Sequence, residues 1–247
     1  MKLLVCVSKT PETTTKITFN GDQTALDTSG VQYIMNPYDE WYALVRALEL
    51  KEALGTGTVT IINVGSAAND PVIRKGLAIG ADEAVRIDKE GGSSLDVAQQ
   101  IAAYAKENSF DIVFFGKETI DYNGSEVGAM TAELLDMPFV SFATKLEMSG
   151  NTATIMRDIE GGEETLEVAI PFALSAAKGL AEQRIPNMKG IMMAKRKPLN
   201  VVAPVDTTNH TQVLTYDLPP AKSAVKLIDP ENMDELVRLL SEEAKVI

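Results

Sequence analysis

Residues 59–87 read VTIINVGSAANDPVIRKGLAIGADEAVRI, and this stretch determines the fold class. Residues 59–64 and 84–87 are short, nearly continuous apolar runs, which is typical of strands buried on both faces of a parallel sheet. Between them, Asp70-Pro71 predicts the N-cap and first turn of a helix, and Gly80 predicts its end. We therefore expect a strand, a crossover helix and a second, parallel strand.

The same alternation continues on both sides of this unit. Residues 3–7 and 112–115 are further strand-like runs. Asn36-Pro37 predicts an N-cap and the first turn of a helix, in which Asp39 and Glu40 favour the positive end, and another helix begins at Ser93 or Ser94. With right-handed crossovers, the order β-α-β-α-β-α-β predicts an α/β fold with a doubly wound, mainly parallel sheet.

Two segments interrupt the alternation. Residues 16–19 and 31–34 alternate weakly around glycines, which predicts a β-hairpin excursion. Between residues 140 and 173 the apolar period is two, with turn residues at 149–151 and 160–162, so an antiparallel meander is expected to close the sheet.

The composition changes again near the C-terminus. After Pro198 the chain is rich in proline, threonine and asparagine, until Asp229-Pro230 caps a last helix with an apolar stripe from Met233 to Leu240. We expect an α/β domain over residues 1–199 and an extended C-terminal arm over residues 200–247 that packs on another chain. The alternative, that the arm folds back on its own domain, stays open.

Composition excludes several classes of function. One cysteine, Cys6, and one histidine, His210, leave no internal disulfide, no two-histidine metal motif and no multi-cysteine cluster. The net charge of −12 argues against nucleic acid or an anionic membrane as the main partner. Residues 1–9 resemble neither a signal peptide nor a transit peptide, so we expect a cytoplasmic protein without membrane insertion.

A ligand crevice is expected beyond the carboxyl ends of the strands, as in other open parallel sheets. After the strand at 112–115, residues 116–128 form a polar loop with glycines that runs into an apolar helix, and loop amides at a helix N-terminus suit a nucleotide phosphate. Residues 64–66 and Asn36-Pro37 lie on the same rim. Neither a GxGxxG nor a GxxxxGK[ST] motif occurs, and each piece alone could be an ordinary turn.

Residues 184–197 are a second candidate site. They contain five basic residues and no acid, together with three methionines, in a chain that is otherwise acidic. Methionine anchors surrounded by positive charge would suit docking of acidic partners. By pattern alone, a solvated basic face with the methionines turned to the core is favoured.

Several motifs together resemble the β subunit of electron transfer flavoproteins, and the resemblance runs from Leu3 to the final helix. The hairpin that reads RDIEGGEETL over residues 157–166 is its most specific part. The other parts are Leu4-Val5-Cys6-Val7, Met35-Asn36-Pro37-Tyr38, the block from Gly116 to Ala132, and the segment from Pro186 to Lys195.

The resemblance implies a Rossmann-like, adenine-nucleotide-binding fold in a heterodimer. An α subunit would hold FAD in a mobile domain, and this chain would be a rigid base that buries AMP and has no catalysis of its own. The flavin of such complexes accepts electrons from acyl-CoA dehydrogenases of fatty acid β-oxidation and related enzymes, and delivers them to a membrane quinone oxidoreductase.

The resemblance also assigns residues. Met188 occupies the apolar anchor of a docking loop over residues 184–197, with Arg184, Lys195, Arg196 and Lys197 around it. The nucleotide pocket falls on residues at four places along the chain: Cys6; Asn36, Pro37, Tyr38 and Asp39; Val64; and Gly116, Lys117, Glu118, Thr119, Ile120, Asp121, Tyr122, Asn123, Gly124, Ser125, Glu126 and Val127.

The sequence departs from this pattern at the end of the loop. Where the mammalian-type loop reads Asn-Gln-Thr, this chain has Ser125-Glu126-Val127, which places an acid at the helix N-terminus. A subclass that shares the valine holds a second FAD in place of AMP and bifurcates electrons from NADH. Its loop carries Asp-x-Asp-Thr-x-Gln, which is absent here, so the form with a single FAD and AMP is favoured.

Two other classes of function are compatible with the residues. A stand-alone nucleotide-binding module would explain the sheet but not the long arm. A hydrolase or ligase would need Asp121 and Glu126 as acid and base, and both are more simply cap and turn residues. We interpret Cys6 as a buried strand thiol and His210 as an exposed linker residue.

Overall fold

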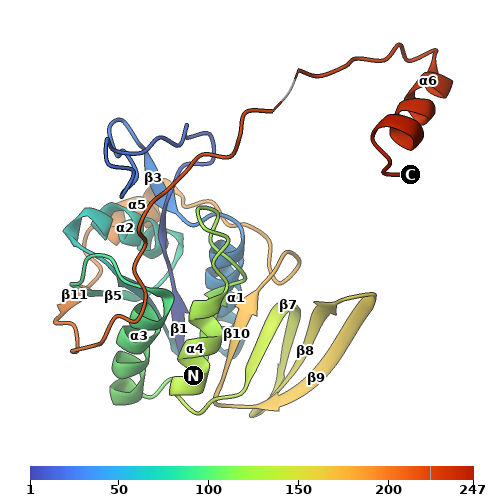
Figure 1. Cartoon of the computed structure of the whole chain (residues 1–247). Helices are drawn as coiled ribbons and strands as arrows, with labels where there is room; N and C mark the ends of the chain where they lie inside the picture. The colour runs from blue at the N-terminus through green and yellow to red at the C-terminus, as the bar shows by residue number, and fades with distance from the viewer. Residues whose placement is uncertain (223) are drawn as a thin grey trace.

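The computed structural model describes residues 1–222 and 224–247. In this part of the chain, nine strands form one sheet in the order β11-β5-β4-β1-β6-β10-β7-β8-β9 (Figure 1). The strands of this sheet are β1 (Lys2–Cys6), β4 (Thr58–Val64), β5 (Glu83–Ile87), β6 (Ile112–Gly116), β7 (Phe139–Ser149), β8 (Thr152–Ile159), β9 (Gly162–Ala169), β10 (Phe172–Ala176) and β11 (Leu199–Val202). The pairs from β11 to β7 are parallel, and β7, β8 and β9 form an antiparallel meander. The predicted fold class is confirmed.

Helices cover both faces of the parallel strands (Figure 1). The helices are α1 (Asp39–Leu54), α2 (Asp70–Ile79), α3 (Ser94–Asn108), α4 (Glu126–Leu134), α5 (Met188–Ala194) and α6 (Met233–Arg238). Side chains of α1 and α2 bury Leu3 and Val5 on one face, whereas α3 and α4 bury Leu4 on the other. This alternation along β1 is what a two-sided core requires of a central strand.

Strand β10 joins the antiparallel meander to the parallel part of the sheet. Strand β10 follows β9 in sequence but lies between β6 and β7, parallel to both. The meander therefore extends the sheet at one edge, with β8 and β9 outermost (Figure 1).

Two expected helix starts were wrong. Helix α1 begins at Asp39 after Tyr38, and not at Asn36-Pro37, because the Asn36 side chain pairs with a distant loop instead of capping the helix. Helix α2 has Asn69 at its N-cap position, and Asp70 is its first residue. Proline in the first turn still marks the start of α2. The N–H groups of a first turn have no carbonyl partner within the helix, so proline, which lacks an N–H, breaks no hydrogen bond there.

The excursion before α1 is antiparallel as expected, but its strands lie elsewhere. Strands β2 (Lys9–Pro11) and β3 (Tyr33–Met35) pair with each other, whereas residues 16–18 form no strand and Phe19 makes only a single bridge to Leu26. Glu12 and Asn20 accept hydrogen bonds from nearby backbone amides. Such local bonds compete with a strand ladder.

The C-terminal arm has two parts. Residues 1–202 are here called the body. Residues 203–216, here called the strap, run along the body past α3 to the excursion, whereas residues 224–247, here called the tip, stand apart from the body (Figure 1). Strand β11 starts at the expected boundary and is paired with β5, so the chain leaves the sheet only after Val202. In the tip, Asn232 and not Asp229 caps α6, and α6 continues into one wider turn, η2 (Leu239–Glu243).

Candidate functional site

The carboxyl ends of β1, β4 and β6 meet on one rim of the sheet. Strand β1 pairs in parallel with β4 on one side and with β6 on the other, so the chain reverses its winding direction at β1. Ligands of open α/β sheets bind at this kind of reversal. The structure brings together here the ends of the three strands, the start of α1 and the loop that precedes α4.

Asn36 ties the start of α1 to that loop. Its side chain is fully buried, donates to the Glu118 carbonyl over 3.0 Å and accepts from the Ile120 amide over 3.0 Å. The amide therefore satisfies two backbone groups of the loop at once, which fixes the loop relative to α1.

Glu40 lies beneath the rim, and the sequence did not reveal its role. Both of its carboxyl oxygens contact Ser8, one accepting from the backbone amide over 2.6 Å and the other from the hydroxyl over 2.6 Å. A Cβ at Gly116 would lie 2.8 Å from Glu40 Cγ, so this close approach requires glycine. Burial raises the pKa of Glu40 to about 8, and the bonds from Ser8 oppose this rise.

The loop of residues 117–125 closes on itself before α4. The Thr119 amide donates to the Gly124 carbonyl over 3.1 Å, and Asn123 adopts a left-handed conformation with φ of 49°. Ser125 occupies the N-cap position of α4 but makes no side-chain capping bond. The first amides of α4 therefore have no side-chain partner from their own cap, and an N-terminus of this kind suits an anion.

The charges around the loop are mixed. Glu126 is the first residue of α4, and Lys117 forms an ion pair with Glu118, with 3.1 Å between the charged atoms. Asp39 is half-buried, and burial raises its pKa while Lys117 opposes that rise. Lys117 therefore places one positive charge beside the carboxylates of Asp39 and Glu118.

Tyr38 completes the rim with an unusual backbone. It is a non-glycine residue with φ of 63°, and its side chain is exposed. Strained backbone conformations of this kind cluster at ligand-binding and other functional sites.

Cys6 and Val64 lie deeper, at the ends of β1 and β4. Burial raises the pKa of the Cys6 thiol, so this thiol is inert as a nucleophile.

A small hollow adjoins the loop. It has a volume of about 210 Å³ and lies between residues 11–17 of the excursion and Ile120 and Asp121. Asp121 accepts a hydrogen bond from the neighbouring Tyr122 amide, as turn residues do.

In the described residues, no group of three or more His, Cys, Asp and Glu side chains could hold a metal ion, and no helix is long and apolar enough to cross a membrane.

The structure divides the expected docking residues into two groups. Met188 is 74% exposed at the start of α5, and Lys195 and Arg196 are exposed after its end. In contrast, Arg184 is paired with Glu52 over 2.7 and 3.0 Å, and the Lys197 ammonium donates to carbonyls at the end of α2.

The methionines of this segment face outward, contrary to the pattern-based expectation. Met192 is 67% exposed and Met193 49% exposed. Helix α5 is short and packs on the end of α2, where a Cβ at Gly190 would lie 2.5 Å from the Ala78 carbonyl oxygen. This close contact through a glycine leaves the long side chains of α5 on the outside.

Comparison with known proteins identifies the family of this chain. The profile of the family described as "Electron transfer flavoprotein domain" matches residues 23–207. The chain is 36% identical to the electron transfer flavoprotein subunit beta of Bacillus subtilis over 261 residues, covering all of both chains. It is 33% identical to the human and 32% identical to the mouse protein of that name, covering all of this chain and 99% of each relative.

The chain belongs to the electron transfer flavoprotein β-subunit family. This membership confirms the resemblance drawn from the sequence motifs. As an electron transfer flavoprotein subunit, the chain is part of an electron carrier and has no catalysis of its own, and the family implies binding of a flavin or nucleotide.

Proposed function

We propose that this chain is the β half of a heterodimeric electron transfer flavoprotein. An α subunit would hold FAD, take electrons from acyl-CoA dehydrogenases and related enzymes, and pass them to a membrane quinone oxidoreductase. The similarity to electron transfer flavoprotein β subunits over the whole chain carries this proposal. Bound FAD would supply the electron transfer, and this chain would provide a rigid base for the α subunit and a docking surface for the partner enzymes.

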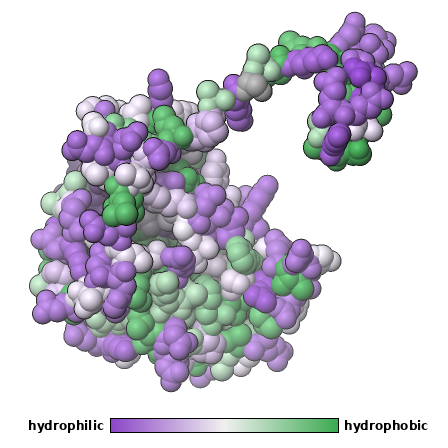
Figure 2. Space-filling model, viewed as in Figure 1, coloured by the Kyte–Doolittle hydropathy of each residue, from purple (hydrophilic) through white to green (hydrophobic). Residues whose placement is uncertain are grey.

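The uncovered tip supports the need for a partner chain. Leu227 is 89% exposed and Val225 83% exposed, and the apolar stripe of α6 includes exposed Met233 and Val237. Figure 2 shows hydrophobic residues on the tip, which lies apart from the body. Exposed apolar residues gathered on an amphipathic helix are typical of a protein–protein contact. We assign this contact to the α subunit.

The rim around Asn36 is the proposed AMP site. The N-terminus of α4, which has no side-chain cap, would receive the phosphate of an adenine nucleotide, and Lys117 of the preceding loop would contribute positive charge. Cys6, residues 36–39, Val64 and residues 116–127 would form the pocket. The loop lacks the Asp-x-Asp-Thr-x-Gln run of bifurcating members, which favours AMP over a second FAD.

Helix α5 is the proposed docking site for dehydrogenases. Met188 would be the apolar anchor, and exposed Lys195 and Arg196 would attract acidic partners. Because Arg184 and Lys197 are engaged within the chain, we propose that they hold the docking segment in place and do not contact the partner themselves.

Co-expression with an α subunit tests the proposal. We expect a yellow heterodimer, and mass spectrometry of the extracted ligands should find one FAD and one AMP for each heterodimer. Two FAD molecules and no AMP would support the bifurcating alternative. A colourless chain that stays monomeric beside the α subunit, or that turns over nucleotides alone, would contradict the proposal.

A further inference from the structure

The strap is held on the body at its first half by α3. The Gln100 side chain donates to the Val205 carbonyl over 2.8 Å and accepts from the Val205 amide over 2.9 Å. Thr207 donates to the Asp96 carboxylate, which Lys89 also contacts over 2.7 Å. Asp96 is 2% exposed, so these bonds are shielded from water. The start of the strap is therefore an ordered part of the domain.

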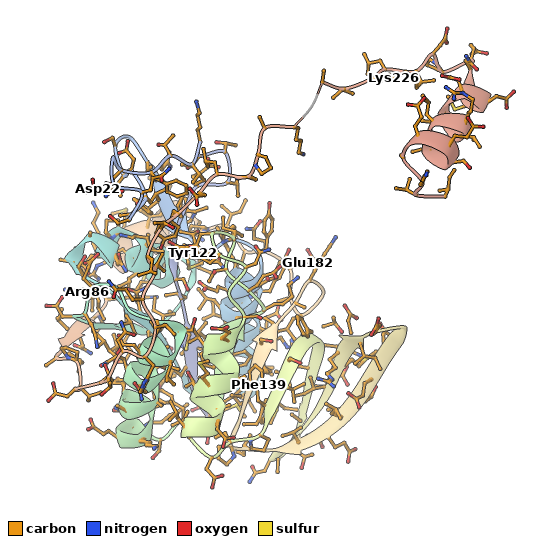
Figure 3. All side chains as sticks on the ribbon, viewed as in Figure 1. Asp22, Arg86, Tyr122, Phe139, Glu182 and Lys226 are labelled. Atoms are coloured by element: carbon orange, nitrogen blue, oxygen red, sulfur yellow. The ribbon has the colours of Figure 1, made fainter. Side chains whose placement is uncertain are left out.

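The other end of the strap meets the candidate nucleotide loop. The Tyr216 amide donates to the Gln23 carbonyl over 2.7 Å, and the Tyr216 ring stacks on Phe19 with 5.3 Å between ring centres. The ring of Tyr122 lies 6.4 Å from that of Tyr216, and the two hydroxyl oxygens are 3.4 Å apart. Tyr122 belongs to the loop between β6 and α4 (Figure 3).

Tyr216 thus joins three segments that are far apart in sequence. Phe19 belongs to the excursion, Tyr122 to the loop and Tyr216 to the strap, shortly before the chain leaves the body toward the tip. Tyr122 is 68% exposed, so most of its side chain is open to solvent apart from this aromatic contact. Groups in contact do not contribute independently to stability, so order in the strap and order in the loop should reinforce each other.

We propose that Tyr216 is a positioning residue that couples the nucleotide loop to the C-terminal arm. Seating of the tip on the partner chain holds the strap in place, and the strap holds residues 117–125 in the conformation that binds the nucleotide. By reciprocity, a bound nucleotide holds the strap and favours seating of the tip. This coupling rests on the proposed function, since it takes the loop as the nucleotide site and the tip as the partner contact.

Hydrogen exchange of the full chain, measured by mass spectrometry, tests the contact itself. The Thr119 amide donates to the Gly124 carbonyl within the loop, and the Ile120 amide donates to the Asn36 side chain, so the exchange of both amides reports opening of the loop. We expect Tyr216→Leu to speed exchange in residues 117–124 by about 2- to 10-fold, the range that corresponds to loss of an aromatic pair. Tyr216→Phe keeps the stacked rings and should stay close to the wild type.

Two further variants complete the test. Leu214→Ala alters an exposed residue of the strap with no such contact and should leave the loop unchanged. Tyr122→Leu gives the reciprocal measurement, in which exchange should speed at residues 213–217. Unchanged exchange in the loop of Tyr216→Leu, and in the strap of Tyr122→Leu, would overturn the coupling.

Titration of AMP against the heterodimer separates this proposal from the proposed function. We expect Tyr216→Leu to weaken AMP binding by about 2- to 10-fold, with Leu214→Ala equal to the wild type. Equal AMP affinity of Tyr216→Leu and the wild type would overturn the coupling to the nucleotide. A wild-type heterodimer that binds no AMP would instead contradict the nucleotide role, and the exchange measurements would still decide whether loop and strap are coupled.

Discussion

Asn36 and Glu40 are single side chains on which the shape of the rim depends. Both are buried, and each makes two hydrogen bonds to a segment distant in sequence, Asn36 to the loop and Glu40 to Ser8. Buried polar groups are costly when a partner is removed, because the remaining group cannot bond to water. The effects of these two residues on stability can therefore be measured directly.

Asn36→Ala should lower the free energy of unfolding by about 2–4 kcal/mol. The change leaves the part-buried Glu118 carbonyl and Ile120 amide without their partner, and an unpaired group that is shielded from water costs on the order of 1–3 kcal/mol. Urea unfolding of the full chain measures the loss. The matched control is Asn200→Ala at an exposed position of β11, which should change stability by less than about 0.5 kcal/mol. Equal stabilities of the two variants would refute this role of Asn36.

Glu40 should make the chain less stable as the pH rises from about 5 to 8. In the folded chain its pKa is raised from 4.5 to about 8, so over this interval the folded state retains a proton that the unfolded state has lost. Fewer protons bound in the unfolded state mean that stability falls with rising pH, by up to about 1.4 kcal/mol per pH unit.

Glu40→Gln tests this pH dependence. Glutamine can still accept from the Ser8 amide and does not titrate, so the fall in the free energy of unfolding between pH 5 and 8 should be much smaller. Asp39, whose pKa is also raised, should leave a residual slope in the same direction. Urea unfolding at several pH values measures both slopes, and identical slopes would show that Glu40 is ionised in the folded chain.

At the scale of elements, the packing of α5 against α2 keeps the methionine side chains of α5 exposed to solvent. The helix contacts α2 through Gly190, and Arg74 of α2 donates to the carbonyl of Ala194, the last residue of α5, and to the Lys197 carbonyl beyond it. Lys197 in turn donates to carbonyls at the end of α2, where a positive charge also suits the helix dipole. These bonds fix α5, and its methionines are left facing solvent.

Met188→Ala should slow electron acceptance from a dehydrogenase by about 5- to 30-fold without changing the bound flavin. Loss of a central apolar anchor typically costs 1–2 kcal/mol or more of binding energy. Stopped-flow reduction of the heterodimer gives the rate, and its absorbance spectrum gives the flavin content. Val201→Ala, at an exposed aliphatic residue of β11, is the control. Equal rates for Met188→Ala and the wild type would remove Met188 from the docking role.

At the scale of the whole molecule, the body and the tip are separable. Among the described residues, every hydrogen bond and ion pair of the tip lies within residues 224–247. In contrast, the strap is bonded to α3 and to the excursion. Removing the strap would therefore disturb the body, whereas removing the tip should not.

Deletion of residues 219–247 should abolish the tight heterodimer and leave the body folded. The truncated chain keeps β11 and Tyr216, so its urea unfolding transition should match that of the full chain. Size-exclusion chromatography with the α subunit, followed at a flavin wavelength, measures the complex. A tight yellow heterodimer formed by the truncated chain would show that the tip is not the main contact.

The sequence by itself determined the α/β class, the four central parallel strands, the meander and the family. These follow from local patterns, since apolar runs, proline and glycine act within a few residues of their own position. The motifs also brought the rim segments into one expected site, which the structure places together at the ends of β1, β4 and β6.

Only the tertiary structure decided how that site is held. Asn36 was expected to cap a helix, yet it bonds to a loop 84 positions away, and the ring of Tyr216 meets Tyr122 across 94 positions. Glu40 has the pattern of an ordinary acid at a helix start and is instead buried under Gly116. Such partners depend on which segments the folded sheet places side by side, and no local pattern of side chains carries that information.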